Sequence, residues 1–193
     1  MPTEKRIERI TRVLSFRQPD LRVVLEGVTI AHNASAVVRT CDAAGVLYLD
    51  VISPNPDLVE FNKAITTRAE KWMSLRVHSS PAACFPDLKK AGFKIAATHL
   101  GDDSVSYADL DYTQPLALVF GSEAEGISAD SLQYADFKIR IPMVGMVQSL
   151  NLSVSVGIIL YEAFRQRREK GYFERPRLPA GELDAFLRKW LKG

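Results

Sequence analysis

Polar side chains that could do chemistry gather in three stretches, each directly after a run of apolar residues that resembles a buried strand. The stretches are 32–42, 118–128 and 139–155. Ligands of an open parallel sheet bind outside the carboxyl ends of its strands. We therefore expect the three stretches to meet at one edge of a sheet and to form a binding site there.

The first stretch combines an amide with a cation. Asn33 can cap the helix that this stretch opens, and Arg39 follows six residues later, about 600° around a helix, so the two need not share a face. Arg39 stands among small and apolar neighbours, and a buried guanidinium without a partner is costly. We expect an anion to meet Arg39, either a ligand or a chain carboxylate such as Asp42.

The second stretch is a loop with a glycine at each end. Gly121 and Gly126 allow the backbone to approach a ligand closely. Glu123 and Glu125 would repel a phosphate, so the loop suits a hydroxyl or an amine, and an ordinary turn fits it equally well.

The third stretch is an apolar loop that ends at a predicted helix start. Its methionines and Gly145 could wrap around an adenine and offer backbone groups to it. Ser149 and Asn151 would project polar atoms from the helix start, and simple capping of the helix is the alternative.

Apolar runs alternate with helical patterns along the chain, which predicts an α/β fold. Several runs are apolar on both faces, as in a mostly parallel sheet covered by helices. Predicted strands are 21–28, 46–53, 74–77, 93–99, 116–121 and 137–141; predicted helices are 3–15, 34–43, 83–90, 128–134 and 149–170. We expect a basic N-terminal helix in 1–20, with a break at residues 18–20, a main α/β domain in 21–171, and a tail with a short amphipathic helix in 172–193.

Several classes of protein are excluded. The chain lacks the glycine-rich motifs of dinucleotide-binding and P-loop proteins. Cys41 and Cys84 are too few for a disulfide framework and lack metal-ligand spacing, so we expect reduced thiols and no metal. The longest weakly polar run, 152–161, is about half of a bilayer span, and no signal-peptide pattern opens the chain, which predicts a cytoplasmic protein without membrane association.

The net charge of +2 hides an uneven distribution. Residues 1–22 and 162–193 together carry +7, which leaves −5 for the middle of the chain. A basic periphery around an acidic body suits a protein that binds a polyanion at its edges, although two solvated helices would look the same.

Together and in this order, the three stretches resemble the motifs of the SPOUT methyltransferases, most closely the TrmH subfamily. The residues that carry the likeness are Asn33 with Arg39, Phe120-Gly121-Ser122-Glu123 with Gly126, and Ile141-Pro142-Met143 with Ser149-Leu150-Asn151. The resemblance covers about residues 5–178.

The resemblance implies a SPOUT fold with a deep C-terminal trefoil knot, a homodimer, and S-adenosylmethionine as methyl donor. It implies a catalytic group of Arg39, Asn33, Glu123, Ser149 and Asn151. The residues expected around the cofactor are Thr98, Gly121, Ile141, Met143 and Leu150.

The implied reaction is 2′-O-methylation of a tRNA ribose, most closely that of guanosine 18 in the D-loop. Because the pKa of arginine stays above about 12, we expect Arg39 to hold the phosphate beside the target ribose, and either group could take the proton. Residues placed to contact RNA are Arg6, Arg9, Arg12, Arg17, His32, Arg165, Arg167, Arg168 and Arg175. Alternatives are the tRNA wobble ribose, rRNA, or a catalytically silent RNA-binding dimer.

Overall fold

The computed structural model describes residues 2–28, 31–55 and 69–192. Its strands are β1 (Gln18–Glu26), β2 (Val46–Ile52), β3 (Ser74–His78), β4 (Lys94–Thr98), β5 (Val105–Ser106), β6 (Leu116–Phe120) and β7 (Phe137–Arg140). Its helices are α1 (Glu4–Ser15), α2 (Ala31–Ala43), α4 (Pro81–Lys90), α5 (Ala129–Leu132), α6 (Leu152–Glu169) and α7 (Ala180–Lys192), with 3-10 turns η2 (Ala69–Trp72) and η3 (Tyr107–Asp109). No helix among the described residues is long and apolar enough to cross a membrane.

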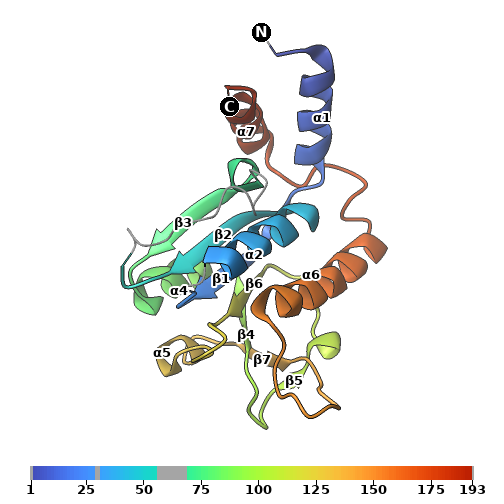
Figure 1. Ribbon diagram of the computed structural model, residues 1–193. Coiled ribbons are helices and arrows are strands. Elements are labelled where there is room, and N and C mark those ends of the chain that lie inside the picture. The colour runs from blue at the N-terminus through green and yellow to red at the C-terminus, as the bar shows by residue number, and fades with distance from the viewer. Residues whose placement is uncertain (1, 29–30, 56–68, 193) are drawn as a thin grey trace.

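The seven strands form one sheet in the order β3-β2-β1-β6-β4-β7-β5, and every pairing between them is parallel. Helices α2 and α6 cover one face, and α4 and α5 cover the other (Figure 1). Strand β6 explains this arrangement, because Leu118 and Phe120 pack toward α2 and α6 whereas Ala117 and Val119 pack toward α4. The predicted parallel sheet with helices on both faces is confirmed.

Some predicted boundaries are wrong. The expected break at residues 18–20 is the first part of β1, whose pairing with β2 shifts in register between Gln18 and Arg22, where Pro19 is accommodated. Strand β5 was not predicted because two residues are too few to show a pattern. Helix α6 begins at Leu152 rather than 149 because Asn151 caps it by accepting from the Ser153 amide at 2.9 Å.

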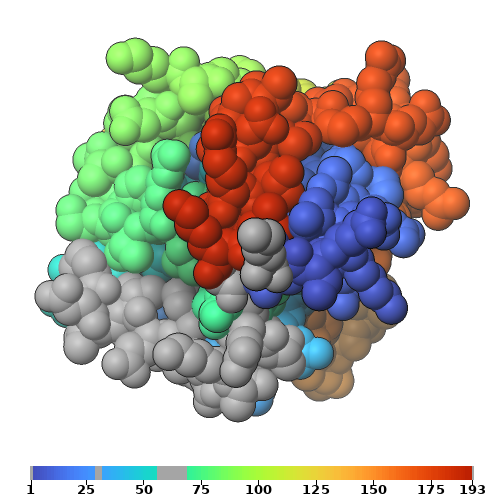
Figure 2. Space-filling model, turned by 90° about the horizontal axis from the view of Figure 1, so that it is seen from above, coloured from blue at the N-terminus to red at the C-terminus, as the bar shows by residue number. Residues whose placement is uncertain are grey.

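The two terminal helices pack on each other and on the sheet. Ile10 and Leu14 of α1 form a cluster with Leu178, with Trp190 of α7 and with Tyr48 of β2. Figure 2 shows the two helices side by side on one face of the molecule. The basic ends of the chain are therefore held together in space.

Two of the arginines predicted to contact RNA, Arg17 and Arg167, lie in the interior, so that prediction is wrong for them. Arg17 is 1% exposed and pairs with Asp42, and its guanidinium also donates to backbone carbonyls. Arg167 is 0% exposed and donates to Asp20 at 2.6 Å, to Gln18 and to three carbonyl oxygens. Both cations tie the ends of the chain to the sheet instead of facing solvent.

We expect Asp20→Asn to destabilise the protein by about 3–5 kcal/mol, because it leaves the buried Arg167 guanidinium without its counter-ion. Urea unfolding followed by circular dichroism would measure the change in the free energy of unfolding. The control is Asp103→Asn, which removes an equally short ion pair, with Lys138, at the surface. Equal losses in the two variants would contradict a structural role for the buried pair.

Candidate active site

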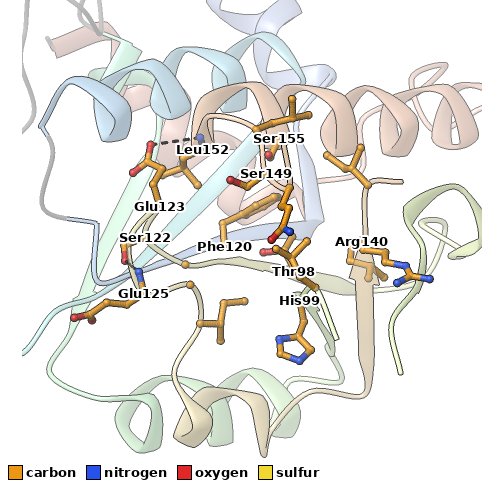
Figure 3. A pocket seen from close by; sticks show the side chains of 18 of the residues that line it. Thr98, His99, Phe120, Ser122, Glu123, Glu125, Arg140, Ser149, Leu152 and Ser155 are labelled. Carbon is orange, nitrogen blue, oxygen red and sulfur yellow. Dashed lines mark hydrogen bonds between the residues drawn. The ribbon is translucent and has the colours of Figure 1, made fainter. Parts of the chain in front are cut away.

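A pocket of about 430 Å³ opens at the carboxyl ends of β4, β6 and β7, which are neighbours in the sheet. Its walls come from three loops, 98–100, 120–127 and 139–150, and from the first half of α6 (Figure 3). The second and third stretches of the sequence thus lie at one edge of the sheet, as the rule for parallel sheets predicts. The volume lies within the range of small-molecule sites, about 300–1,000 Å³.

The loop after β6 is folded back tightly on itself. Ser122 and Gly126 form an isolated antiparallel bridge, with the Gly126 amide donating to the Ser122 carbonyl at 2.9 Å. A Cβ atom on Gly121 would lie 2.0 Å from the backbone of Gly126, so only glycine fits there. Gly126 adopts a φ of +68°, which also favours glycine. Both glycines therefore serve to close the loop beside the pocket.

A buried carboxylate that the sequence analysis missed holds the far end of this loop. Glu26, at the end of β1, accepts from the Ser128 amide at 3.1 Å and from the hydroxyls of Ser128 and Ser131 at 2.6 and 2.8 Å. Its signal was an acid directly after the apolar run 23–25 at the end of the strand. The carboxylate joins β1 to the start of α5 and so fixes the end of the loop that runs from β6 to α5.

Glu123 links all three stretches. Its Oε1 accepts from the Asn33 side chain, from Asn151 Nδ2 at 3.3 Å and from the Leu152 amide at 3.4 Å. Asn151 also donates to Asn33 Oδ1 at 3.3 Å. Because the carboxylate faces the amino end of α6, the helix dipole stabilises its charge. The contact between Glu123 and Leu152 is drawn in Figure 3.

The structure brings most of the predicted site residues together. All five residues expected around the cofactor line the pocket, namely Thr98, Gly121, Ile141, Met143 and Leu150. Glu123 and Ser149 of the expected catalytic group also line it. Asn33 and Asn151 adjoin the pocket through Glu123. Asn33 lies inside the first turn of α2 and does not cap it, because the helix begins at Ala31. Ser149 lies in the loop before α6.

Arg39 differs from what its neighbours suggested. Its side chain is exposed, forms no ion pair with any described residue and does not line the pocket. The alternative of a salt bridge to Asp42 is wrong, because Asp42 pairs with Arg17. The apolar neighbours of Arg39 in the sequence suggested that it is buried. Successive residues of a helix point to different faces, so those neighbours can be buried while Arg39 is exposed.

The other cations predicted to contact RNA lie at the surface. His32 is exposed, and so are Arg6, Arg9, Arg12, Arg165, Arg168 and Arg175. Arg165 is engaged by Glu162 and Glu169 at 2.8 and 2.7 Å, and these carboxylates raise the pKa of its guanidinium. His99 and Arg140 were not predicted, yet both line the pocket. Each directly follows or ends a strand, a position that could have indicated them.

Among the described residues, one group of side chains that could bind a metal ion lies on the face of the sheet that α4 covers. Ligand atoms of Asp50, His78 and Cys84 are all within 4.8 Å of one another. Asp50 is already bound by His78 at 2.8 Å and by Arg22 at 3.2 Å. Burial raises the pKa of the Cys84 thiol to about 12, which favours the neutral form. Asp50 is therefore a buried carboxylate that Arg22 and His78 already engage, and it does not line the pocket.

Comparisons with known proteins agree on one family. The family model described as the SpoU rRNA Methylase family matches residues 20–161. A tRNA (guanosine(18)-2'-O)-methyltransferase of Thermus thermophilus is 46% identical over 190 residues, which cover 98% of this chain and 97% of that protein.

Two solved structures are informative. That of the Aquifex aeolicus TrmH/SpoU tRNA modifying enzyme has a TM-score of 0.93 and 46% identity, and the match covers 98% of this chain and 96% of that one. The Streptomyces viridochromogenes methyltransferase AviRb, solved in complex with AdoMet, has a TM-score of 0.65 and 26% identity, with coverage of 78% and 59%.

Proposed function

The chain belongs to the SpoU methylase family, and from this premise we propose that it transfers a methyl group from S-adenosylmethionine to the 2′-oxygen of guanosine 18 in tRNA. The observation that carries the proposal is a pocket formed by the second and third motif stretches, with Glu123 joining Asn33 of the first stretch to its edge. The nearly full-length likeness to a guanosine-18 enzyme favours this ribose over the wobble ribose and rRNA. We also propose that the protein acts in the cytoplasm and that its C-terminal segment forms a trefoil knot.

The pocket fits the methyl donor. Its apolar walls, which include Phe120, Ile139 and Ile159, can enclose an adenine ring, and the loop closed by Gly121 brings backbone groups next to it. The bound cofactor would supply an electrophilic methyl group on a positively charged sulfur. Thr98, Gly121, Ile141, Met143 and Leu150 are proposed to hold it.

The remaining task of the protein is to position the ribose and to remove its proton. Ser149 lines the pocket, and Asn151 and Asn33 are fixed beside it by Glu123, so that hydroxyl and amide groups can orient the ribose. Arg39 is proposed to hold the phosphate next to the target nucleotide. The proton of the 2′-hydroxyl passes to that phosphate or, if Arg39 first loses its own proton, to the neutral guanidine.

We further propose a homodimer in which Arg39 serves the pocket of the partner. Arg39 is exposed and does not line the pocket of its own subunit, although Arg39 and the pocket residues all belong to the family motifs. Large apolar side chains are exposed on the loop before α6 and on α6 itself, namely Val144, Met146, Val147, Val154 and Tyr161. A second copy that covers these side chains would remove them from water and would place α2 beside the other pocket.

Mixed dimers test this arrangement. Arg39→Ala and Gly121→Ala subunits, co-expressed with different tags and purified as heterodimers, should recover about half of the wild-type activity, because one of the two sites is then intact. Each variant should be inactive as a homodimer. If Arg39 instead served the pocket of its own subunit, the heterodimer would be as inactive as its parents, and this part of the proposal would fail.

The function itself is tested by incubating the purified protein with labelled S-adenosylmethionine and unmodified tRNA transcript. Nuclease digestion and mass spectrometry then locate the methyl group. We expect it on the 2′-oxygen of guanosine 18, and a transcript that carries 2′-deoxyguanosine at this position should accept none. Label at another ribose, or only on rRNA, would mean that the enzyme modifies that nucleotide and not guanosine 18. No transfer to any RNA would favour the silent RNA-binding dimer.

A further inference from the structure

A second cavity, of about 390 Å³, lies away from the pocket, between the C-terminal ends of α1, α2 and α6. Val13 and Phe16 come from the end of α1, Phe164 and Arg168 from the end of α6, and Phe173 from the segment after α6. The turn after α2 closes it, and no described residue lines both cavities. Its walls therefore come from residues that the proposed chemistry leaves unused.

Aromatic rings dominate the wall. The ring of Phe173 lies 4.8 Å from that of Phe164 and 6.5 Å from that of Phe16, measured between centroids. Phe16 remains 38% exposed and Val13 36% exposed, so folding alone leaves apolar surface uncovered here. An open aromatic wall of this kind suits a flat, apolar-faced group that arrives from solution.

The surroundings of the cavity are cationic. Arg168 lines it, and Arg9 and Arg12 lie one helical turn before Val13 and Phe16, on the same side of α1. All three guanidinium groups are exposed, and none forms an ion pair with a described residue. Arg17 at the cavity is neutralised by Asp42, which also belongs to the wall. The uncompensated charge at the rim is therefore positive.

We propose that this cavity receives an unstacked base from a single-stranded loop of the RNA, while Arg9, Arg12 and Arg168 hold the adjoining phosphates. This inference rests on the proposed function, since it concerns the RNA that the enzyme modifies. Aromatic rings beside arginines are the combination that binds single-stranded nucleic acid, because every base has a face that can stack. The free cations favour this occupant over the apolar face of another protein. Phe16, Phe164 and Arg168 line this one cavity, and Figure 2 shows α1 beside the C-terminal part of α6.

The test compares two exposed apolar residues of α1. Phe16 lines the cavity, whereas Ile7, also 38% exposed, does not. The dissociation constant of the wild-type and variant proteins for tRNA is measured at several salt concentrations. Phe16→Ala should weaken binding about tenfold, in line with the loss of one stacked base. Ile7→Ala should leave binding unchanged.

The salt dependence separates stacking from charge. Loss of a stacked base releases no counter-ions, so Phe16→Ala should not change the slope of log affinity against log salt. Arg12→Ala should lower that slope by about one. Phe16→Tyr, which keeps a ring, should retain the wild-type affinity, and Phe16→Leu, which keeps only apolar bulk, should not. Equal binding by the leucine and wild-type proteins would overturn the proposal.

Other outcomes are equally decisive. If Phe16→Ala leaves the affinity for tRNA intact but lowers the mass measured by light scattering, the cavity is an interface between copies of this chain and no base enters it. If the wild-type protein methylates tRNA and Phe16→Ala binds it normally, the inference fails and the proposed function stands. If the wild-type protein binds no tRNA at all, both fail.

Discussion

Replacing Arg39 by alanine is expected to lower methyl transfer to tRNA by about 100- to 1,000-fold, the usual cost of removing one positioned donor from a reacting site. The structure shows an exposed guanidinium that no described carboxylate engages, so its charge is free for an RNA phosphate. Its removal would leave the target ribose without an anchor, and proton transfer would lose either the acceptor or the group that positions the acceptor. Single-turnover transfer to tRNA transcript would measure the loss.

The same variant should bind S-adenosylmethionine normally, because Arg39 does not line the pocket of its own subunit and its proposed contact in the partner's pocket is with the RNA phosphate. Isothermal titration of the cofactor in the absence of RNA is therefore the control. Arg39→Lys tests the geometry: it keeps the charge but loses the planar pair of donors, so activity should fall between those of the wild-type and alanine proteins. An alanine variant with at least half of the wild-type rate would rule out the proposed role.

The sequence was sufficient to predict where the pocket lies. Strand runs that are apolar on both faces indicated a covered parallel sheet, and the polar and glycine residues after them marked its ligand-binding edge. Thr98 ends β4, and Gly121 and Ile141 follow β6 and β7. The three residues line one pocket because β6, β4 and β7 are neighbours. Periodicity alone did not show this neighbour relation, which depends on how the chain crosses over the sheet.

Burial of cations was the property that the sequence did not reveal. Arg17, Arg167 and Arg168 look alike in the sequence, because all three lie in basic segments at the ends of the chain. The structure buries the first two, because Asp42 and Asp20 supply counter-ions from distant positions. Asp20 comes within reach of Arg167 only when β1 begins at Gln18, a start that Pro19 concealed. Both errors thus have the same cause, a contact between residues far apart in the chain.

The hydrogen bonds around Glu123 could be predicted only in part from the sequence. The sequence indicated Asn33, Glu123 and Asn151 as polar groups of one site, but not that a single carboxylate oxygen would accept from both amides. Capping explains the rest: Asn151 uses its Oδ1 for the start of α6 and so leaves its Nδ2 directed at Glu123. The residue thus fixes both the helix boundary and the geometry of the pocket.

Gly121→Ala is expected to weaken S-adenosylmethionine binding by at least about 100-fold, or about 2.7 kcal/mol. The added Cβ atom would lie 2.0 Å from the carbonyl carbon and oxygen of Gly126, so backbone and not a mobile side chain must move. That movement opens the bridge between Ser122 and Gly126 and shifts Glu123 away from Asn33 and the Leu152 amide. The walls on both sides of the pocket would change together, which is why a single methyl group should have so large an effect.

Titration of the cofactor into the purified variant measures the loss, with circular dichroism to confirm that the sheet is intact. Gly181→Ala is the matched control, because a Cβ atom there meets nothing within 4 Å and the position lies in α7, away from the pocket. Its cofactor affinity should equal that of the wild-type protein, and its helix should gain slight stability. Only a local obstruction predicts a folded Gly121→Ala protein that no longer binds the cofactor. If this variant bound the cofactor within about threefold of the wild-type affinity, the loop after β6 would not be a wall of the cofactor site, and the donor would have to bind elsewhere.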